Sequence, residues 1–370
     1  MSRWLDTTLG EVCELYQPQT ISSAELVADG EYPVYGANGV IGRFDKFNHA
    51  EPQLLITCRG ATCGSVNVSQ PNSWINGNAM VVKPKDISVE LDYLKHLFNG
   101  GLDLSAVITG AAQPQITRQS LAPLKVRFPA PIEQRRIAAI LDQADALRSK
   151  RREALVQLDS LTQSIFIEMF GDAETIFNKW PTKKLGEILN FLTSGSRGWA
   201  EYYSDSGALF LRIQNVCKDE LKLDDVAFVN APDSAEAKRT RVQEGDVLLS
   251  ITADLGRTAV IPAGLGDAHI NQHLSILRTS DVIPKYLSAF LTSPAGQREI
   301  LGRDKHGVKA GLNFDDIRSF RIPMPPQPLQ YDFCQKVETV LRQRLLHQQA
   351  LNELDSLFAS LQHRAFRGEL

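Results

Sequence analysis

The sequence lacks several features that would assign it to a familiar class of protein. No run of about 18 apolar residues occurs, so no membrane-spanning segment is predicted. The five cysteines are odd in number and never spaced as Cys-x-x-Cys, which excludes a disulfide framework and a zinc knuckle. Residues 1–15 carry no charged-then-apolar signal pattern. Together these absences favour free thiols and a cytoplasmic location.

An excess of charge of either sign is also missing. The chain has 40 Lys and Arg against 43 Asp and Glu, a formal net charge of −3, and 43% of its residues are hydrophobic. This composition is globular and not that of a disordered chain. A free-standing phosphate binder is usually basic. The balance therefore argues against a protein that coats nucleic acid by itself, but it suits one arm of an assembly whose other subunits supply positive charge.

Motifs of catalytic sites are absent as well. The sequence contains no GxxxxGK phosphate loop, no GxGxxG cradle, no GxSxG elbow and no Asn/Asp-Pro-Pro-aromatic motif of the amino-methyltransferases. His269 and His273 are four residues apart, but Ile270 stands where a metalloprotease has Glu, and the run HINQHLSIL is typical of a strand. We therefore predict no catalytic residue and no metal site.

What the sequence does contain is an internal repeat. Trp4-x-x-x-x-Leu-Gly-Glu recurs at Trp180, QLLITCRGATCGSV (53–66) resembles DVLLSITADLGRTAV (246–260), and LDSL occurs at 158–161 and again at 354–357. The offset is 176 residues at the start of each copy and 196 at the end. The 370-residue chain is thus predicted to be two copies of one unit, the second with roughly 18 extra residues within 190–245.

Each copy combines a strand-rich part with a long helix, which makes the predicted fold class α+β. Apolar runs such as LLIT, AMVV, VLLSI and LSIL predict strands, and short helices are expected at 91–98 and 284–291. A proline-rich stop, FPAP or MPPQP, then precedes each long helix. The predicted domains are 1–130, with a long helix at 131–171, and 172–325, with a long helix at 326–370.

Apolar residues at heptad spacing indicate that the two long helices pair, in antiparallel orientation and with pseudo-two-fold symmetry. The residues predicted to pair the helices or to dock other subunits are Ile137, Ile140, Leu147, Leu158, Leu161 and Ile165 in the first helix and Phe333, Val340, Leu354, Leu357 and Leu361 in the second. A helix over 132–170 would be about 58 Å long. The alternative is that each helix packs only on its own domain.

Polar side chains gather in the loops of both copies. Arg can contact guanine with two hydrogen bonds and Asn or Gln can do so with adenine, so these loops are candidate readers of DNA. The candidates are Tyr35, Asn38, Arg43, Arg59, Gln113, Gln115 and Arg118 in the first copy and Ser196, Arg197, Tyr203, Arg212, Asn215, Arg257, His273, Lys305, His306 and Lys309 in the second. A structural alternative is clearest for Asn38, because Asn38-Gly39 is typical of a hairpin turn.

Three segments carry a resemblance to a known family: YPVYGANGVIGRFD (32–45), QPQITRQSLAPLKVRFPAPIEQRRIAAILDQAD (113–145) and SGSRGWAEYYS…FLRIQNV (194–216). They resemble the specificity subunits of type I restriction–modification systems, over essentially the whole chain. The second junction, MPPQPLQ, departs from the family pattern because it lacks the Glu-Gln pair found at 133–134.

The resemblance implies two target-recognition domains, each reading one half of a split target on double-stranded DNA, joined by two long antiparallel helices that set the gap. It also implies docking of two methyltransferase subunits and two restriction–translocation subunits. S-adenosylmethionine, ATP and Mg would then bind those partners, with no cofactor in this chain. The alternatives are a protein–protein scaffold with two modules that do not bind DNA, and an enzyme with an unfamiliar site such as the histidine pair.

Overall fold

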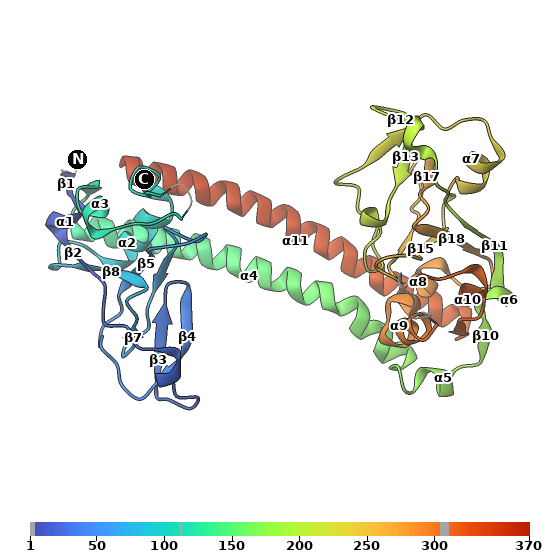
Figure 1. Ribbon diagram of the computed structural model, residues 1–370, viewed down its shortest axis with the longest axis horizontal. Coiled ribbons are helices and arrows are strands. Elements are labelled where there is room, and N and C mark those ends of the chain that lie inside the picture. Colours follow the sequence, from blue (N-terminus) through green and yellow to red (C-terminus); the bar gives the residue numbers. More distant parts are fainter. Residues whose placement is uncertain (1–3, 111–112, 304–310) are drawn as a thin grey trace. The chain divides into compact units, whose positions relative to one another are not determined.

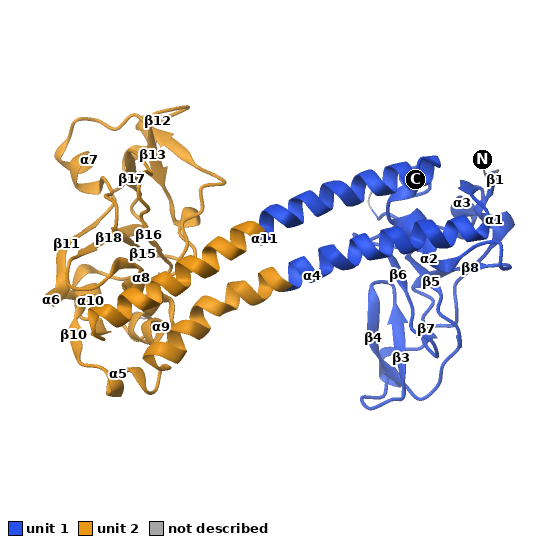
Figure 2. Ribbon diagram, turned by 180° about the vertical axis from the view of Figure 1, so that it is seen from behind, with its two compact units in different colours: residues 1–153, 347–370 blue, residues 154–346 orange. Residues whose placement is uncertain are grey.

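The computed structural model describes residues 4–110, 113–303 and 311–370, which divide into two compact units. Unit 1 is made of residues 1–153 and 347–370, and unit 2 of residues 154–346 (Figure 2). Each unit holds one copy of the strand-rich part (Figure 1). The two long helices, α4 (Pro131–Phe170) and α11 (Gln327–Arg367), each contribute residues to both units.

The described residues of unit 1 form three sheets. The first pairs β1 (Leu5–Thr8) with β9 (Lys125–Phe128). The second has the order β2 (Cys13–Tyr16), β8 (Ala79–Pro84), β5 (Leu54–Thr57), β6 (Val66–Val68), with all neighbours antiparallel. The third has the order β4 (Gly39–Phe44), β3 (Tyr32–Gly36), β7 (Trp74–Ile75), and its β3–β7 pair is parallel.

Unit 2 repeats this arrangement with one added strand. β10 (Thr182–Lys184) pairs with β19 (Arg321–Pro323). The next sheet has the order β11 (Leu189–Ser194), β18 (Leu274–Thr279), β15 (Val247–Ser250), β16 (Thr258–Val260). The last has β12 (Tyr203–Ser204), β14 (Ala227–Val229), β13 (Ala208–Leu211), β17 (Ala268–Ile270), with β13–β17 parallel. The matching strand orders confirm the predicted duplication, and β12 is an addition of unit 2.

Short helices connect the strands. Unit 1 has α1 (Leu9–Val12), a 3-10 turn (Ser23–Glu25), α2 (Leu91–His96) with a following π-helical turn (Leu97–Gly101), and α3 (Arg118–Leu121). Unit 2 has α5 (Ile176–Lys179), α6 (Leu185–Ile188), 3-10 turns (Trp199–Tyr202 and Ile213–Asn215), α7 (Ala235–Thr240), α8 (Pro284–Thr292), α9 (Pro294–Leu301) and α10 (Phe314–Arg318). The helices expected at 91–98 and 284–291 are α2 with its π-helical turn and α8.

A buried glutamine fixes the start of each long helix. Gln134 is fully buried; its Nε2 donates to Ser88 O (2.7 Å) and Pro129 O (2.8 Å), and its Oε1 accepts from Glu90 N (2.9 Å). Gln330 takes the same place in unit 2, where it accepts from Ile283 N and donates to Pro325 O, each at 2.9 Å. Gln330 is therefore the equivalent of the glutamine that the MPPQPLQ junction seemed to lack.

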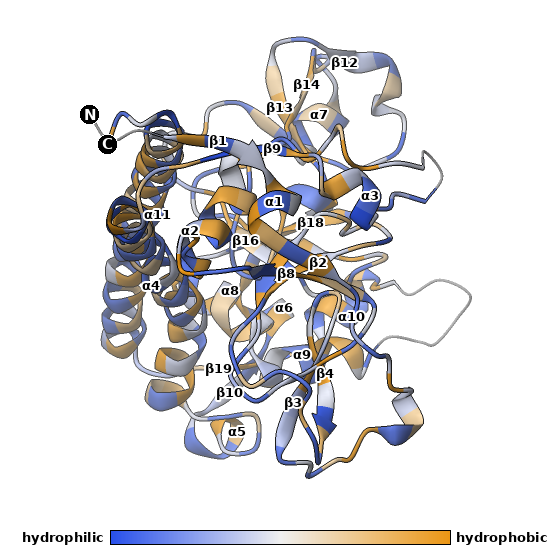
Figure 3. Ribbon diagram, turned by 90° about the vertical axis from the view of Figure 1, so that its left-hand side faces the viewer, coloured by the Kyte–Doolittle hydropathy of each residue, from blue (hydrophilic) through white to orange (hydrophobic). Residues whose placement is uncertain are grey.

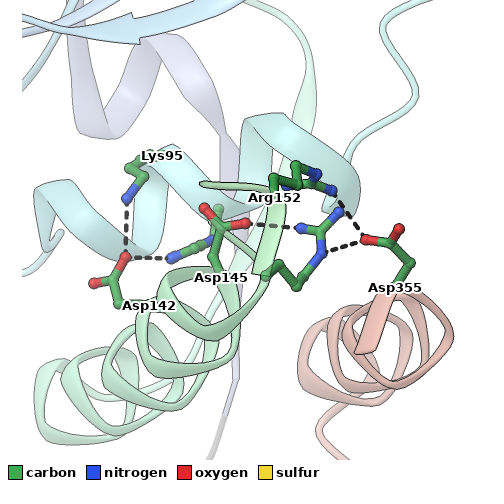
Figure 4. A network of polar contacts seen from close by, with 7 residues as sticks. Lys95, Asp142, Asp145, Arg152 and Asp355 are labelled. Atoms are coloured by element: carbon green, nitrogen blue, oxygen red, sulfur yellow. Dashed lines mark hydrogen bonds and ion pairs between the residues drawn. The ribbon is translucent and has the colours of Figure 1, made fainter. Parts of the chain in front are cut away.

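The long helices run antiparallel within each unit and are joined by a repeated ion pair. In unit 1, Arg148 Nε of α4 contacts Asp355 of α11 at 2.6 Å, and Arg152 reaches the same carboxylate at 3.0 Å (Figure 4). In unit 2, Arg344 Nε of α11 contacts Asp159 of α4 at 2.7 Å. The two pairs are related by the 196-residue offset with the helices exchanged. The predicted helix pairing is thus present in each unit.

Of the eleven residues predicted for the heptad seam, eight are buried or half-buried and three are exposed. Ile137, Phe333 and Val340 are buried, and Ile140, Leu158, Ile165, Leu354 and Leu361 are half-buried. Leu147, Leu161 and Leu357 are instead exposed. On α4 the positions that face inward are Leu141, Arg148 and Thr162, each one residue after the predicted Ile140, Leu147 and Leu161. On α11 the corresponding inward positions are Val337, Arg344 and Leu351. The prediction followed leucines, whereas arginine and threonine occupy part of the real seam. Figure 3 shows hydrophobic and hydrophilic residues alternating along α4 and α11.

Each unit has its own main core. In unit 1 the strands β5 and β8 and helix α2 pack with residues of α4 and with Ala365 of α11. In unit 2 the strands β15 and β18 and helix α8 pack with Phe166, Phe170 and Phe333 of the long helices. Among the residues that the structure describes, no helix combines the length and the apolar character required to cross a membrane.

Candidate nucleic-acid interface

One end of the sheets in unit 1 gathers loops that are far apart in the sequence. The chain leaves β2, β3, β5 and β7 at this end, so the segments 17–20, 37–38, 58–65 and 76–78 lie there together with 113–117. Thr57 Oγ1 donates to Ala37 O (2.6 Å), Thr62 Oγ1 donates to Asn38 Oδ1 (2.8 Å), and Arg59 forms a β-bridge with Gln115. We call these five segments the loop face of unit 1.

Unit 2 has the corresponding loop face. It consists of segments 195–198, 212–215, 251–257, 271–273 and 311–312, which follow β11, β13, β15 and β17 or bridge to them. Thr252 is bridged to Gly311, and Ser196 to Asn271. Asn271 N donates to Leu211 O at 3.1 Å, as Asn76 N donates to Tyr35 O at 2.9 Å in unit 1. The repeat therefore extends from the strands to the position of the loops.

The structure places some predicted residues of unit 1 on the loop face and others in the framework. Arg59 and Gln113 are exposed, and Gln115 is half-buried beside Arg59. Arg118 is exposed at the start of α3, directly after this face. Asn38 is on the face, but its Oδ1 accepts hydrogen bonds from Thr57 and Thr62, so it stabilises the loops.

Two predicted residues of unit 1 lie in the framework and not on the loop face. Tyr35 is 6% exposed and packs with Leu55 and Ile75, so it belongs to the core. Arg43 pairs with Pro33 at the far end of the β3–β4 hairpin, where its guanidinium donates to Gly30 O and Glu31 O. The hairpin itself is confirmed: β3 and β4 pair around the turn, and Gly39 has a φ of +112° that a residue with a side chain rarely adopts.

Unit 2 shows a similar division. Arg197 is exposed in segment 195–198, and His273 is half-buried in segment 271–273. Ser196 is also on the face, where its hydroxyl donates to Glu236. Arg257 is paired with Asp254 within its own loop. Lys305, His306 and Lys309 lie outside the described residues.

Three further predicted residues of unit 2 hold the framework or lie away from the loop face. Asn215 is 2% exposed; it caps the 3-10 turn by accepting from Arg212 N and donates to Lys222 O and Asp225 O. Arg212 holds the same loop by bonding Asp225. Tyr203 is exposed but sits level with Ala208, at the end of its sheet opposite Leu211 and the loop face. The residue types that read bases are also those that bind backbone groups, so sequence alone did not separate them.

The two histidines do not form one site. His269 lies in β17, is buried, and packs against the Trp199 ring at 5.1 Å between centroids; burial lowers its pKa. A turn separates it from His273, so the expectation of one continuous strand over HINQHLSIL is wrong. Among residues 4–110, 113–303 and 311–370, no three His, Cys, Asp or Glu side chains are grouped so as to hold a metal ion.

Sequence reasoning missed side-chain amides on both loop faces. Gln17 and Asn78 are exposed in unit 1, and Gln272 is half-buried in unit 2. A usable signal was present, because Asn78 and Gln272 lie in the turn that follows the same Ile-Asn pair in each repeat, INGN and INQH.

The comparisons with known proteins agree with the repeat. A family model described as the type I restriction modification DNA specificity domain matches residues 1–157 and 178–356. The chain is 22% identical over 339 residues to the type I restriction enzyme MjaIX specificity subunit of Methanocaldococcus jannaschii, covering 86% of this chain and 77% of that protein. It is 26% identical over 364 residues to the EcoKI specificity subunit of Escherichia coli strain K12, covering 90% and 73%.

A solved structure has the same fold. The S subunit of a type I restriction–modification system from M. genitalium matches with a TM-score of 0.63 at 16% sequence identity, and the match covers 99% of this chain and 96% of that one.

Proposed function

Because the chain belongs to the type I restriction–modification specificity subunits, which are non-catalytic DNA-recognition chains, we propose that each loop face reads one half of a bipartite DNA target. The observation that carries this proposal is the repetition of the loop face: equivalent segments follow equivalent strands in both units, while their side chains differ. Two such faces would recognise two different short sequences.

The polar side chains of the loop faces suit the reading of base edges. Unit 1 presents the exposed Arg59 and Gln113, and unit 2 presents the exposed Arg197 and the half-buried Gln272. Guanidinium and amide groups match the hydrogen-bonding edges of guanine and adenine in the major groove. The near-neutral charge of the chain, −3 overall, indicates that partners supply much of the phosphate binding.

We further propose that α4 and α11 set the gap between the half-sites and dock two methyltransferase subunits. α4 has 40 residues, which correspond to about 60 Å of helix. Exposed apolar side chains on these helices, among them Val156 (70% exposed) and Leu345 (59% exposed), suit contact with other subunits. In this proposal S-adenosylmethionine, ATP and Mg bind the methyltransferase and restriction subunits of a cytoplasmic complex.

A pair of matched exchanges tests the proposal. In one variant residues 1–130 are replaced by the same segment of a relative with a different target, and in the other residues 172–325 are replaced. Each subunit is co-expressed with its methyltransferase, and methylated adenines are mapped by sequencing. We expect each exchange to change one half-site and to leave the other half-site and the gap unchanged. A change of both half-sites by either exchange would contradict the proposal, and a scaffold that does not bind DNA would give no sequence-specific methylation.

A further inference from the structure

The turn over residues 271–273 on the loop face of unit 2 is held from several sides. Asn271 is 8% exposed; its N donates to Leu211 O, its O accepts from Leu274 N, and its Oδ1 accepts from His273 N, each at 3.1 Å. His273 O in turn accepts from Ile251 N at 3.0 Å. The backbone that carries Gln272 and His273 is therefore fixed before any ligand binds.

A chain of side-chain contacts orients the Gln272 amide. Gln272 Nε2 lies 3.1 Å from His273 Nε2, and His273 Nδ1 lies 2.5 Å from Thr252 Oγ1. An amide nitrogen can only donate, so His273 Nε2 accepts. In a neutral ring the other nitrogen then carries the proton, and Nδ1–H donates to Thr252. This arrangement uses one N–H of the amide and leaves its second N–H and its carbonyl oxygen as a donor–acceptor pair.

On the basis of the proposed function, we propose that Gln272 is a base-reading residue of unit 2 that selects adenine, with His273 and Thr252 as its positioning residues. Adenine presents N7 as an acceptor and N6–H as a donor in the major groove, and a glutamine amide matches both. Because His273 and Thr252 hold the amide in advance, less side-chain freedom is lost on binding DNA.

The equivalent turn in unit 1 supports this assignment by contrast. Asn76-Gly77-Asn78 aligns with Asn271-Gln272-His273. A Cβ at Gly77 would lie 2.6 Å from Pro18 O and 2.6 Å from Thr20 Oγ1, so that position has no room for a side chain. The same backbone turn therefore presents an oriented amide in unit 2 and a bare backbone at the matching position in unit 1. We expect Gln272 to contribute only to the half-site read by unit 2.

The test uses the purified complex of the subunit with its methyltransferase and duplexes in which each position of the unit 2 half-site carries each of the four bases. The exchange of residues 172–325 identifies that half-site. Gln272→Ala is expected to reduce the preference for adenine at one position by about 5- to 150-fold, the range that a two-hydrogen-bond contact usually gives. Gln272→Glu has the same shape but can only accept, so it is expected to move the preference at that position toward cytosine. Gln243→Ala is the matched control, because Gln243 is an exposed glutamine at the opposite end of β15.

The positioning role has its own readout. His273→Ala is expected to weaken discrimination at the same position and to raise KM for the original target more than it lowers kcat. His273→Gln keeps an acceptor near Gln272 and is expected to restore part of the discrimination. Unchanged base preference in both Gln272 variants, or an equal loss of binding to all four duplexes, would overturn the assignment. A wild-type complex that methylates without any bipartite preference would instead refute the proposed function.

Discussion

The two units share a framework and differ in what is attached to it. Both have the same order of strands in their main sheet and the same parallel pair in the smaller one, but unit 2 adds the edge strand β12 and the helix α7 within 190–245. The added segment has a small core of its own, in which Trp199, Phe210 and Ala237 pack together, and polar contacts such as Asp225 with Arg212 and Glu220 with Arg344 fix its loops. The comparison teaches that the buried strands are duplicated, whereas the exposed connections vary.

The units also differ in how tightly they hold the long helices. Unit 2 packs four rings together, Phe166, Phe170, Tyr286 and Phe333, with centroids 4.9–5.8 Å apart. In unit 1 the positions of Phe166 and Phe333 are taken by Gln362 and Ile137, which leaves Tyr93 against Phe366 at 5.7 Å and Phe128 at 5.8 Å. Paired substitutions at equivalent positions of the two units test this asymmetry.

The largest effect is expected from the aromatic positions. Phe170→Ala removes a fully buried ring that contacts three others and is expected to cost about 3–5 kcal/mol in the free energy of unfolding of unit 2. Phe366→Ala, at the equivalent but half-buried position, is expected to cost less in unit 1. Hydrogen exchange of the core amides of each unit measures both values. Equal losses would show that the extra rings add nothing.

The buried glutamines test the shared part of the framework. Gln134→Leu leaves a buried N–H of Glu90 and carbonyls of Ser88 and Pro129 unpaired and is expected to cost about 2–3 kcal/mol. Gln330→Leu leaves two such groups and is expected to cost about 1–2 kcal/mol. Gln157→Leu, at an exposed position of α4, is the control and should lie within about 0.5 kcal/mol of the wild type. Thermal unfolding ranks the three variants by their loss of stability. A larger loss for Gln330→Leu than for Gln134→Leu would contradict the prediction.

A histidine in unit 1 gives that unit a dependence on pH. His96 is buried and bonds Asp142 of α4 at 2.8 Å; burial lowers its pKa, although Asp142 acts in the opposite direction. In the unfolded chain this histidine has a pKa of about 6.5 and binds a proton more readily than in the folded unit. The stability that the neutral, buried His96 contributes is therefore complete above about pH 6.5, and it is lost as the pH falls from there toward the folded pKa.

His96→Gln should therefore flatten the loss of unit 1 stability between about pH 7 and pH 5. Burial also lowers the pKa of His49 in the same unit, so part of the dependence should remain. Urea titrations at a series of pH values measure how the free energy of unfolding of unit 1 depends on pH. His363→Gln, at an exposed position on α11, is the control. If the free energy of unfolding fell as steeply with pH in His96→Gln as in the wild type, His96 would not be the source of the pH dependence.

The repeated ion pair is expected to give the smallest effect. Arg148 is 17% exposed and stacks over Phe358 at 4.2 Å, so Arg148→Ala should cost about 1 kcal/mol or slightly more. Arg344 is 34% exposed, and Arg344→Ala should cost roughly 0.2–1 kcal/mol while increasing hydrogen exchange in residues 217–222. Arg342→Ala, whose pair with Glu338 is exposed, is the neutral control. Unaltered exchange in residues 217–222 would show that Arg344 does not hold this segment.

Much of the fold was predictable because buried strands and long helices leave a periodic record. LLIT and VLLSI became β5 and β15, and the proline-rich stops preceded α4 and α11. Which face of each long helix is buried was harder to predict. Arg148 faces inward because it contacts Asp355 and Phe358 there, while its neighbour Leu147 is exposed. No periodicity of apolar residues contains that information.

The candidate site was less predictable for a related reason. Arg212 and Arg197 are the same residue type in loops of the same copy, yet Arg212 is bonded to Asp225 and Arg197 is exposed. Which arginine is available depends on a carboxylate that only the folded chain brings near. Gln272 was overlooked because the histidines on either side of it drew attention as metal ligands, although its own turn had a counterpart in the first repeat.

The composition of the units has a consequence for chains that lack the last residues of α11. Unit 2 is continuous, from residue 154 to 346, whereas the core of unit 1 is completed by Ala365 and Phe366 of the α11 segment. Unit 1 therefore depends on the last residues of α11, whereas unit 2 does not. A chain cut before residue 347 would keep every residue of unit 2 but would leave the Tyr93 side of unit 1 without the Phe366 ring that covers it.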